Sequence, residues 1–136
     1  MTIAPLRPIA FEAMNTRAEW MKITRVYADE NGESHFGEME IALRDAGEIG
    51  HLSKAIPAKS VIFRTNPPDY DFDWHPAPQR QFIVLLDGEL EIEVSDGQRR
   101  TFTGGEILLV EDTTGKGHKS RHVKKIERRS VFIVLE

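Results

Sequence analysis

The sequence predicts an all-β fold, a jelly-roll barrel formed by one domain of ordinary size for its 136 residues. Two observations lead to this prediction. Short apolar runs recur along the chain and are separated by clusters rich in Gly, Pro, Asp and Asn, a spacing typical of β-sandwiches and barrels. Residues 89–94, ELEIEV, alternate charged and apolar side chains with the period expected of a strand that has one face in water.

Turn signals indicate where the strands begin and end. The pair Asp87-Gly88 stands between apolar residues 81–86 and the strand at 89–94, and predicts a tight hairpin because glycine adopts positive φ without strain. A second pair, Asp96-Gly97, predicts another turn. In total we expect about eight or nine strands, enough to cover most sheet edges of a jelly roll. The other expected strands are residues 22–28, 35–43, 59–65, 98–102, 106–110, 118–126 and 130–136.

We expect an N-terminal arm at 1–21 and a barrel at 22–136. Prolines and charged residues interrupt the first twenty residues, so no apolar segment of secretory length is present and we expect no signal peptide. The longest apolar runs, such as FIVLL and ILLV, are far shorter than the roughly 20 residues that cross a bilayer. We therefore expect a cytoplasmic protein that has no membrane partner.

Composition excludes several classes of function. Asp and Glu outnumber Lys and Arg by 22 to 18, and the net charge of −4 argues against a nucleic-acid partner. The chain has no cysteine, so a metal would have to be held by nitrogen and oxygen ligands. The usual hydrolase, nucleotide-binding and zinc-protease motifs are absent from the sequence.

Four polar residues stand out as candidates for a cavity site. Residues of equal parity share one face of a strand, so His75, Ala77 and Gln81 are expected to face the barrel interior. Gln81 interrupts an apolar strand and needs a partner, which is either His75, a ligand or water. His118 and His122 likewise share a face, and either ring can reach the interior.

Basic residues offer a second candidate feature. Arg64 has the opposite parity to Val61 and Phe63, so it either reaches the cavity as a clamp for a carboxylate or phosphate, or stays on the surface. The basic run at 116–129 either steers an anion toward His118 or forms a solvated strand face, and the second reading is the more common one.

The order of these elements resembles the cupin superfamily, and in particular small single-domain cupins of the conserved-barrel type with degenerate metal motifs. The resemblance covers most of the chain from about residue 35. The first cupin motif is G-x5-H-x-H-x3,4-E-x6-G. Its spacing is kept by His75 and Gly88, but Asp69, Ala77 and Gln81 stand in the positions of the opening Gly, the second His and the Glu.

The second cupin motif, G-x5-P-x-G-x2-H-x3-N, begins at Gly105. Glu111 takes the place of its proline, the loop before His118 is two residues longer, and His122 takes the place of its asparagine. Carried over residue by residue, the resemblance implies a metal site for Fe, Mn, Ni or Zn made by His75, Gln81 and His118. The change from carboxylate to amide is expected to weaken such a site, because an amide oxygen coordinates a cation without neutralising it.

Two functions stay open at this point. The first is binding of a small, anionic organic molecule in the barrel, by His75, Gln81, His118, Arg64 and His122, without an obligatory metal. The alternative is a metal-dependent dioxygenase or isomerase that uses His75, Gln81 and His118 as ligands, with His122 or Glu111 as a proton-transfer group. The resemblance also implies a homodimer, in which the arm at 1–21 can cross between subunits.

Overall fold

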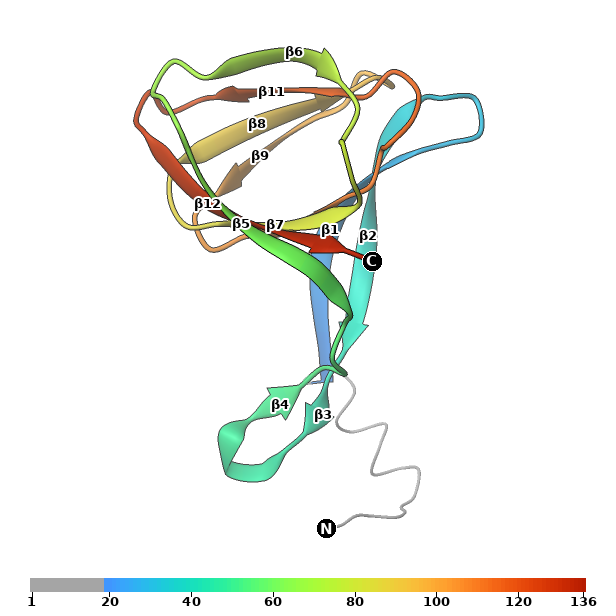
Figure 1. The fold of residues 1–136 in the computed structure, drawn as a ribbon, viewed down its shortest axis with the longest axis vertical. Coiled ribbons are helices and arrows are strands. Elements are labelled where there is room, and N and C mark those ends of the chain that lie inside the picture. Colours follow the sequence, from blue (N-terminus) through green and yellow to red (C-terminus); the bar gives the residue numbers. More distant parts are fainter. Residues whose placement is uncertain (1–18) are drawn as a thin grey trace. The chain divides into compact units, whose positions relative to one another are not determined.

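The computed structural model describes residues 19–136, and this part of the chain is built from β-strands and one short 3₁₀ helix, η2 (Gly47–Ile49) (Figure 1). The all-β prediction is therefore confirmed. Within the same residues, no helix has the length and hydropathy needed to span a membrane. The strands are β1 (Trp20–Ala28), β2 (Ser34–Ala42), β3 (Arg44–Asp45), β4 (His51–Leu52), β5 (Ala58–Asn66), β6 (Asp71–His75), β7 (Gln81–Leu85), β8 (Glu89–Val94), β9 (Arg99–Thr103), β10 (Ile107–Val110), β11 (His118–His122) and β12 (Arg128–Leu135).

The described residues divide into two compact units. The barrel unit contains Ile23–Met39 and Ile56–Glu136. The other unit contains residues 19–22 and Glu40–Ala55, in which the short strands β3 and β4 pair antiparallel. The arm predicted at 1–21 lies outside the described residues except for its last part, from residue 19.

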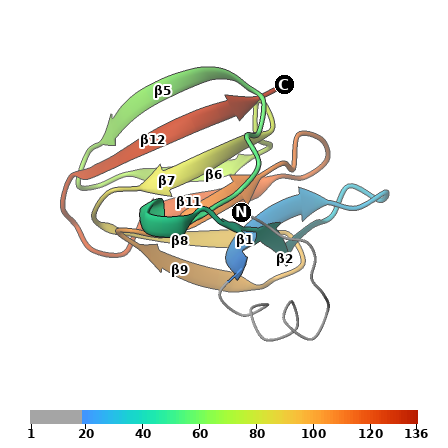
Figure 2. The same ribbon diagram turned by 90° about the horizontal axis from the view of Figure 1, so that it is seen from below.

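Two sheets of unequal size enclose the interior of the barrel unit. The larger sheet has the order β2-β1-β10-β7-β12-β5, and the smaller has the order β6-β11-β8-β9. Strand β1 runs parallel to β10, whereas the pairs β10–β7, β7–β12 and β12–β5 are antiparallel. Figure 2 shows β5, β12 and β7 side by side. In Figure 1 the strands β6, β11, β8 and β9 lie across the barrel from them.

One predicted hairpin is present and the other is wrong. The Asp96-Gly97 turn joins the antiparallel pair β8–β9, with Gly97 at a φ of 101°. Asp87-Gly88 also makes a turn, with Gly88 at a φ of 79°, but β7 and β8 belong to different sheets. The Asp87 carboxylate accepts the backbone N–H of Arg129 at 2.6 Å, which fixes a corner between the sheets. Turn chemistry is the same for a hairpin and for a corner, so the local pattern could not separate them.

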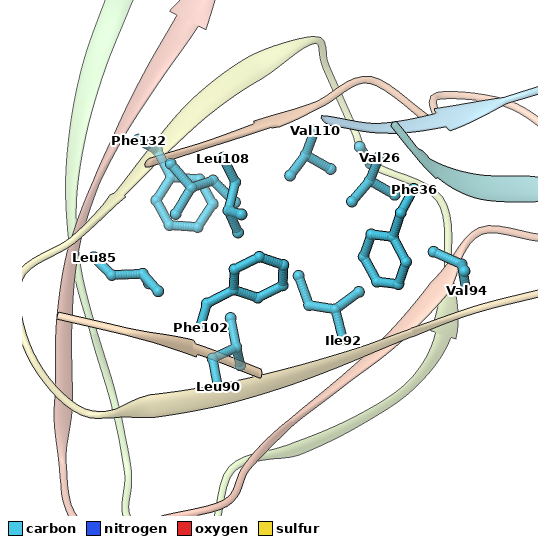
Figure 3. Packing of buried hydrophobic residues seen from close by; sticks show 12 residues of the cluster. Val26, Phe36, Leu85, Leu90, Ile92, Val94, Phe102, Leu108, Val110 and Phe132 are labelled. Atoms are coloured by element: carbon cyan, nitrogen blue, oxygen red, sulfur yellow. The ribbon is translucent and has the colours of Figure 1, made fainter. Parts of the chain in front are cut away.

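Alternating side chains from both sheets form the hydrophobic core. In β8 the buried positions alternate as ELEIEV predicts, with Leu90, Ile92 and Val94 inside. Figure 3 shows Leu90 and Ile92, together with Phe102 of β9, facing Leu108 of β10 and Phe132 of β12. The two inner faces thus fill much of the barrel with apolar side chains, as packed sheets generally do.

Three strands were not predicted, and β6 is the important one. The segment around it reads as a loop because Pro67, Pro68 and Pro76 surround a short polar stretch. In the structure β6 is an edge strand of the smaller sheet and pairs with β11, which places His75 opposite His118. Edge strands tolerate nearby prolines because one side of their backbone has no partner strand.

Truncation of Leu108 tests the packing of the core. The Leu108 side chain is completely buried, and Leu108→Ala is expected to lower the free energy of unfolding by about 2–5 kcal/mol through lost burial and an unfilled cavity. Urea denaturation followed by circular dichroism measures this difference. Thr101→Ala, at an exposed position of β9, is the control and is expected to change stability by no more than about 0.5 kcal/mol. Equal effects of the two substitutions would contradict the packing described here.

Candidate ligand-binding site

A cavity of about 250 Å³ lies within the barrel unit, and both sheets contribute to its wall. Much of the wall is aliphatic or aromatic. No Asp or Glu from residues 19–136 lines the cavity, although this part of the chain is rich in acidic residues. The polar side chains of the wall are Arg64, Tyr70, His75, Gln79, Gln81, His118, Ser120 and Arg128.

The rings of His75 and His118 lie beside each other, with 4.5 Å between their centroids. His75 is the last residue of β6 and stacks on Phe72 at a centroid distance of 4.0 Å. Its Nδ1–H donates to the Asp73 carbonyl at 2.7 Å, which leaves Nε2 as the free ring nitrogen. Burial lowers the pKa of His75 and the neighbouring His118 adds to this effect, so the neutral ring is favoured.

His118, the first residue of β11, is held from outside the cavity wall by Asp112. The Asp112 carboxylate is completely buried, and its Oδ2 accepts a hydrogen bond from His118 Nδ1 at 2.6 Å. This contact fixes the ring orientation and leaves Nε2 free, an arrangement found for imidazoles that act on a ligand. Asp112 also accepts the backbone N–H of Ala77 through its carbonyl at 3.0 Å, so it joins the two cavity loops.

Gly117 allows these loops to approach each other closely. Its φ is 74°, and a Cβ at this position would overlap the backbone carbonyl of His75. The Gly117 carbonyl accepts a hydrogen bond from the Ser34 hydroxyl at 2.7 Å, which ties the same loop to β2. The long second-motif loop therefore lies packed against the end of β6, because glycine alone fits there.

The guanidinium groups of Arg64 and Arg128 also contribute to the wall of the cavity. Arg64 of β5 lies over the Phe132 ring at 5.1 Å. Arg128 opens β12 and is buried, and its side chain donates to His122 Nε2 at 3.1 Å and to Asn66 Oδ1 at 2.7 Å. Arg128 thus places a buried positive charge at the cavity, and Arg64, which is an exposed residue, adds a second one.

The structure places four of the predicted site residues in the cavity wall, namely His75, Gln81, His118 and Arg64. The expectation for His75 and Gln81 rested on their equal parity along a single strand, and that reason is wrong. His75 and Gln81 belong to β6 and β7, which lie in different sheets, and they face the same space because the chain crosses the barrel between them. His122 is buried and does not line the cavity, but it contacts Arg128.

The sequence analysis missed Arg128 and placed Glu111 differently from the structure. Arg128 belongs to the basic run that was expected to be solvated, but it shares parity with Phe132 in a strand whose even positions are buried. That parity is the signal that could have identified it. Glu111 pairs instead with Arg25 at 2.6 Å and Arg80 at 2.8 Å. Burial raises the pKa of Glu111, but hydrogen bonds from these two arginines outweigh burial and lower it.

The residues present do not fit the divalent metal site that the resemblance implies. Two imidazoles and the Gln81 amide face the cavity, whereas Fe, Mn, Ni and Zn sites ordinarily combine imidazole with carboxylate. Among the described residues, no group of three His, Asp or Glu side chains could hold a metal ion. Metal binding by His75, Gln81 and His118 stays a prediction.

The two facing sheets define a jelly-roll barrel, which is the fold that the resemblance implied. The chain is similar to a Cupin 2 conserved barrel domain protein from Salinispora arenicola, with a TM-score of 0.48 and 14% identity over 99% of this chain and 91% of that one. It is also similar to a cupin domain from Bordetella pertussis, with a TM-score of 0.44 and 22% identity over 56% of this chain and 79% of that one.

One curated protein shows similarity in sequence. The chain is 28% identical to oryzines biosynthesis cluster protein J of Aspergillus oryzae over 90 residues, which make up 65% of this chain and 49% of that protein. The chain thus spans about half the length of the curated relative that it matches. No family model matches the sequence.

Restoring the metal ligands that the altered motif lacks tests whether these positions have the geometry of a metal site. Ala77 lines the cavity beside His75 and Gln81, so Ala77→His combined with Gln81→Glu should add an imidazole and a carboxylate to the existing pair of histidines. We expect the double variant to bind Zn²⁺ or Ni²⁺ nearly stoichiometrically and the parent to bind much less, as measured by elemental analysis after dialysis. The control adds His118→Ala to the double variant and should lose the metal. A double variant that binds no more metal than the parent would contradict this geometry.

The pKa values of His75 and His122 are expected to shift in the opposite direction to that of His35. Burial lowers the pKa of His75 and of His122 below the ordinary value of 6.5, whereas hydrogen bonds to Asp29 and Asp96 raise that of His35. Stability due to neutral His75 and His122 is present above pH 6.5 and is lost as the pH falls toward their folded-state pKa values. The His35 contribution is present below pH 6.5 and is lost as the pH rises through its folded-state pKa. Imidazole NMR titration checks the order, and a His75 midpoint above that of His35 would contradict it.

Proposed function

We propose that this small cupin domain binds a small organic anion in its barrel cavity, with His75, Gln81, His118 and Arg64 as polar anchors. The observation that carries the proposal is the composition of the wall, which has two guanidinium groups and no carboxylate among the described residues. Positive charge inside a poorly solvated space attracts an anion far more strongly than the same charge on the surface.

The apolar side chains of the cavity wall suit a ligand that has an apolar body. Ile83, Ile92 and Phe132 contribute to the wall together with other aliphatic and aromatic side chains. A volume of about 250 Å³ is slightly below the range of roughly 300–1,000 Å³ usual for drug-sized ligands. The ligand that fits best is therefore of metabolite size, with one charged end and a compact hydrophobic part.

His75 supplies a hydrogen bond and not a fixed charge. The neutral His75 ring has its Nε2 lone pair free, because Nδ1 donates to the Asp73 carbonyl. It can therefore accept a hydrogen bond from a hydroxyl or amide of the ligand. The Gln81 amide can both donate and accept, so it tolerates either partner. These groups orient the ligand, and the guanidinium groups neutralise it.

The alternative function, a metal-dependent dioxygenase or isomerase, is supported less well. It requires the donor set that Ala77 and Gln81 have altered. Elemental analysis of untagged protein prepared without chelator separates the two functions. Near-stoichiometric metal that is lost in both His75→Ala and His118→Ala would support the alternative.

Ligand titration tests the proposed function. Benzoate, isovalerate and neutral benzamide are titrated into ¹⁵N-labelled protein, and shifts of backbone amides are followed by NMR. At least one acid is expected to move the amides of Gln81 and Ser120, and His75→Ala should weaken its affinity by about 2- to 10-fold, because the acid loses its contact with the ring in the cavity wall. Arg121→Gln, on the exposed side of β11, is the control and should bind like the parent. Absence of binding to the parent by every compound, or unchanged affinity in His75→Ala, would overturn the proposal.

A further inference from the structure

Arg128 has an unusual environment for a charged residue. Its side chain is only 3% exposed, and its partners are the neutral oxygen of Asn66 and the neutral nitrogen of His122. The ring of Tyr70 lies 5.5 Å from the guanidinium carbon. Among residues 19–136, no carboxylate lies within ion-pair distance of this guanidinium, although nine other pairs involve basic side chains there. Arg128 is therefore a buried cation that forms no ion pair within the described part of the chain, and the nearby Asp87 carboxylate is engaged by Arg129.

Burial of an unpaired charge lowers the stability of a folded protein, so the buried guanidinium of Arg128 requires an explanation. Buried charges in proteins are generally paired, and the penalty for an isolated one is several kcal/mol. Burial lowers the pKa of Arg128, and the positive charge of Arg64 contributes to the same shift. A guanidinium nevertheless remains protonated at neutral pH, and so the charge stays in place.

The surrounding residues hold the guanidinium in one orientation. His122 is completely buried, and its Nδ1 donates to the Pro68 carbonyl at 3.3 Å. Its Nε2 is therefore the acceptor for Arg128 Nε. Asn66 accepts from Nη2, and among the described residues no side-chain or backbone acceptor engages Nη1. Gly88 makes room for the stem of Arg128, since a Cβ there would lie 3.1 Å from Arg128 Cβ and Cγ.

A second guanidinium faces the same space. Arg64 and Arg128 both line the cavity, from the adjacent strands β5 and β12. The two like charges repel each other, and their repulsion is relieved when one anion lies between them. Paired guanidinium groups are well suited to a carboxylate, because its two oxygens accept several N–H groups in one plane.

We propose that Arg128, with Arg64 on the adjacent strand β5, forms the seat for the carboxylate of the cavity ligand. This inference rests on the proposed function and makes it more specific: the ligand is a small monocarboxylate whose apolar part lies among the hydrophobic residues of the wall. His122 and Asn66 are positioning residues, which hold the guanidinium but do not touch the ligand.

The experiment compares a carboxylate with its neutral amide. Benzoate and benzamide have nearly the same shape, and they are titrated by NMR into the parent, Arg128→Gln, Arg64→Gln and Arg121→Gln. The parent is expected to prefer benzoate. Arg128→Gln should weaken benzoate binding by about 10- to 100-fold, the effect of one charged hydrogen-bonded pair, and leave benzamide binding unchanged. Arg64→Gln should act in the same direction, and Arg121→Gln should act on neither compound.

The outcomes separate this inference from the proposed function. Benzoate binding that Arg128→Gln leaves intact, or an equal loss for benzoate and benzamide, overturns the carboxylate seat while cavity binding stands. Absence of binding to the parent by benzoate, isovalerate and benzamide overturns both. If Arg128→Gln does not fold, Arg128→Lys replaces it. The lysine keeps the charge but cannot form a planar pair of hydrogen bonds, so it should retain a reduced preference for benzoate over benzamide. An unchanged preference would overturn the planar seat.

Discussion

The buried hydrogen bond between Asp112 and His118 is the interaction on which the cavity depends. A carboxylate without access to water is stable only when it is paired, and Asp112 has this one side-chain partner among the described residues, since its Oδ1 has none. The same residue accepts the backbone N–H of Ala77, and Gly117 in the following loop packs on the His75 carbonyl. One buried pair thus sets the orientation of His118 and the position of the loop that follows β6.

The cavity that results has two chemically different parts. One part presents two imidazoles, of which His75 is held neutral by burial, and an amide. The other presents the guanidinium groups of Arg64 and Arg128 on a background of aliphatic and aromatic side chains. A ligand that satisfies both sets of groups needs a charge and a hydrogen-bonding group in addition to its apolar body, which restricts its orientation. Specificity of this kind comes from unsatisfied polar groups more than from the apolar surface that surrounds them.

The sequence predicted the strands better than the connections between them. Alternation in ELEIEV reflects local geometry and gave the bounds of β8 correctly. Asp87-Gly88 was read as a hairpin, because the turn itself contains no information about which sheet the next strand joins. Likewise, His75 and Gln81 do share the cavity, but they reach it from opposite sheets. Arg128 was assigned to a solvated run because six other Lys and Arg residues dominate that pattern. Its burial depends on contacts with Asn66 and Gly88, which lie far away in sequence.

The altered cupin motif and the two cavity arginines both determine the charge of the site. In this cavity a divalent cation would meet only neutral protein ligands, His75, Gln81 and His118, and two guanidinium groups would share the same space. Its full positive charge would then add to theirs in a medium of low dielectric constant, where like charges repel strongly. An organic anion has the opposite effect, since it neutralises charge that the fold has already buried. Replacement of the glutamate position by Gln81 also removes a carboxylate that would compete with such a ligand for Arg64 and Arg128. The loss of metal donors and the presence of the buried arginine therefore favour the same occupant.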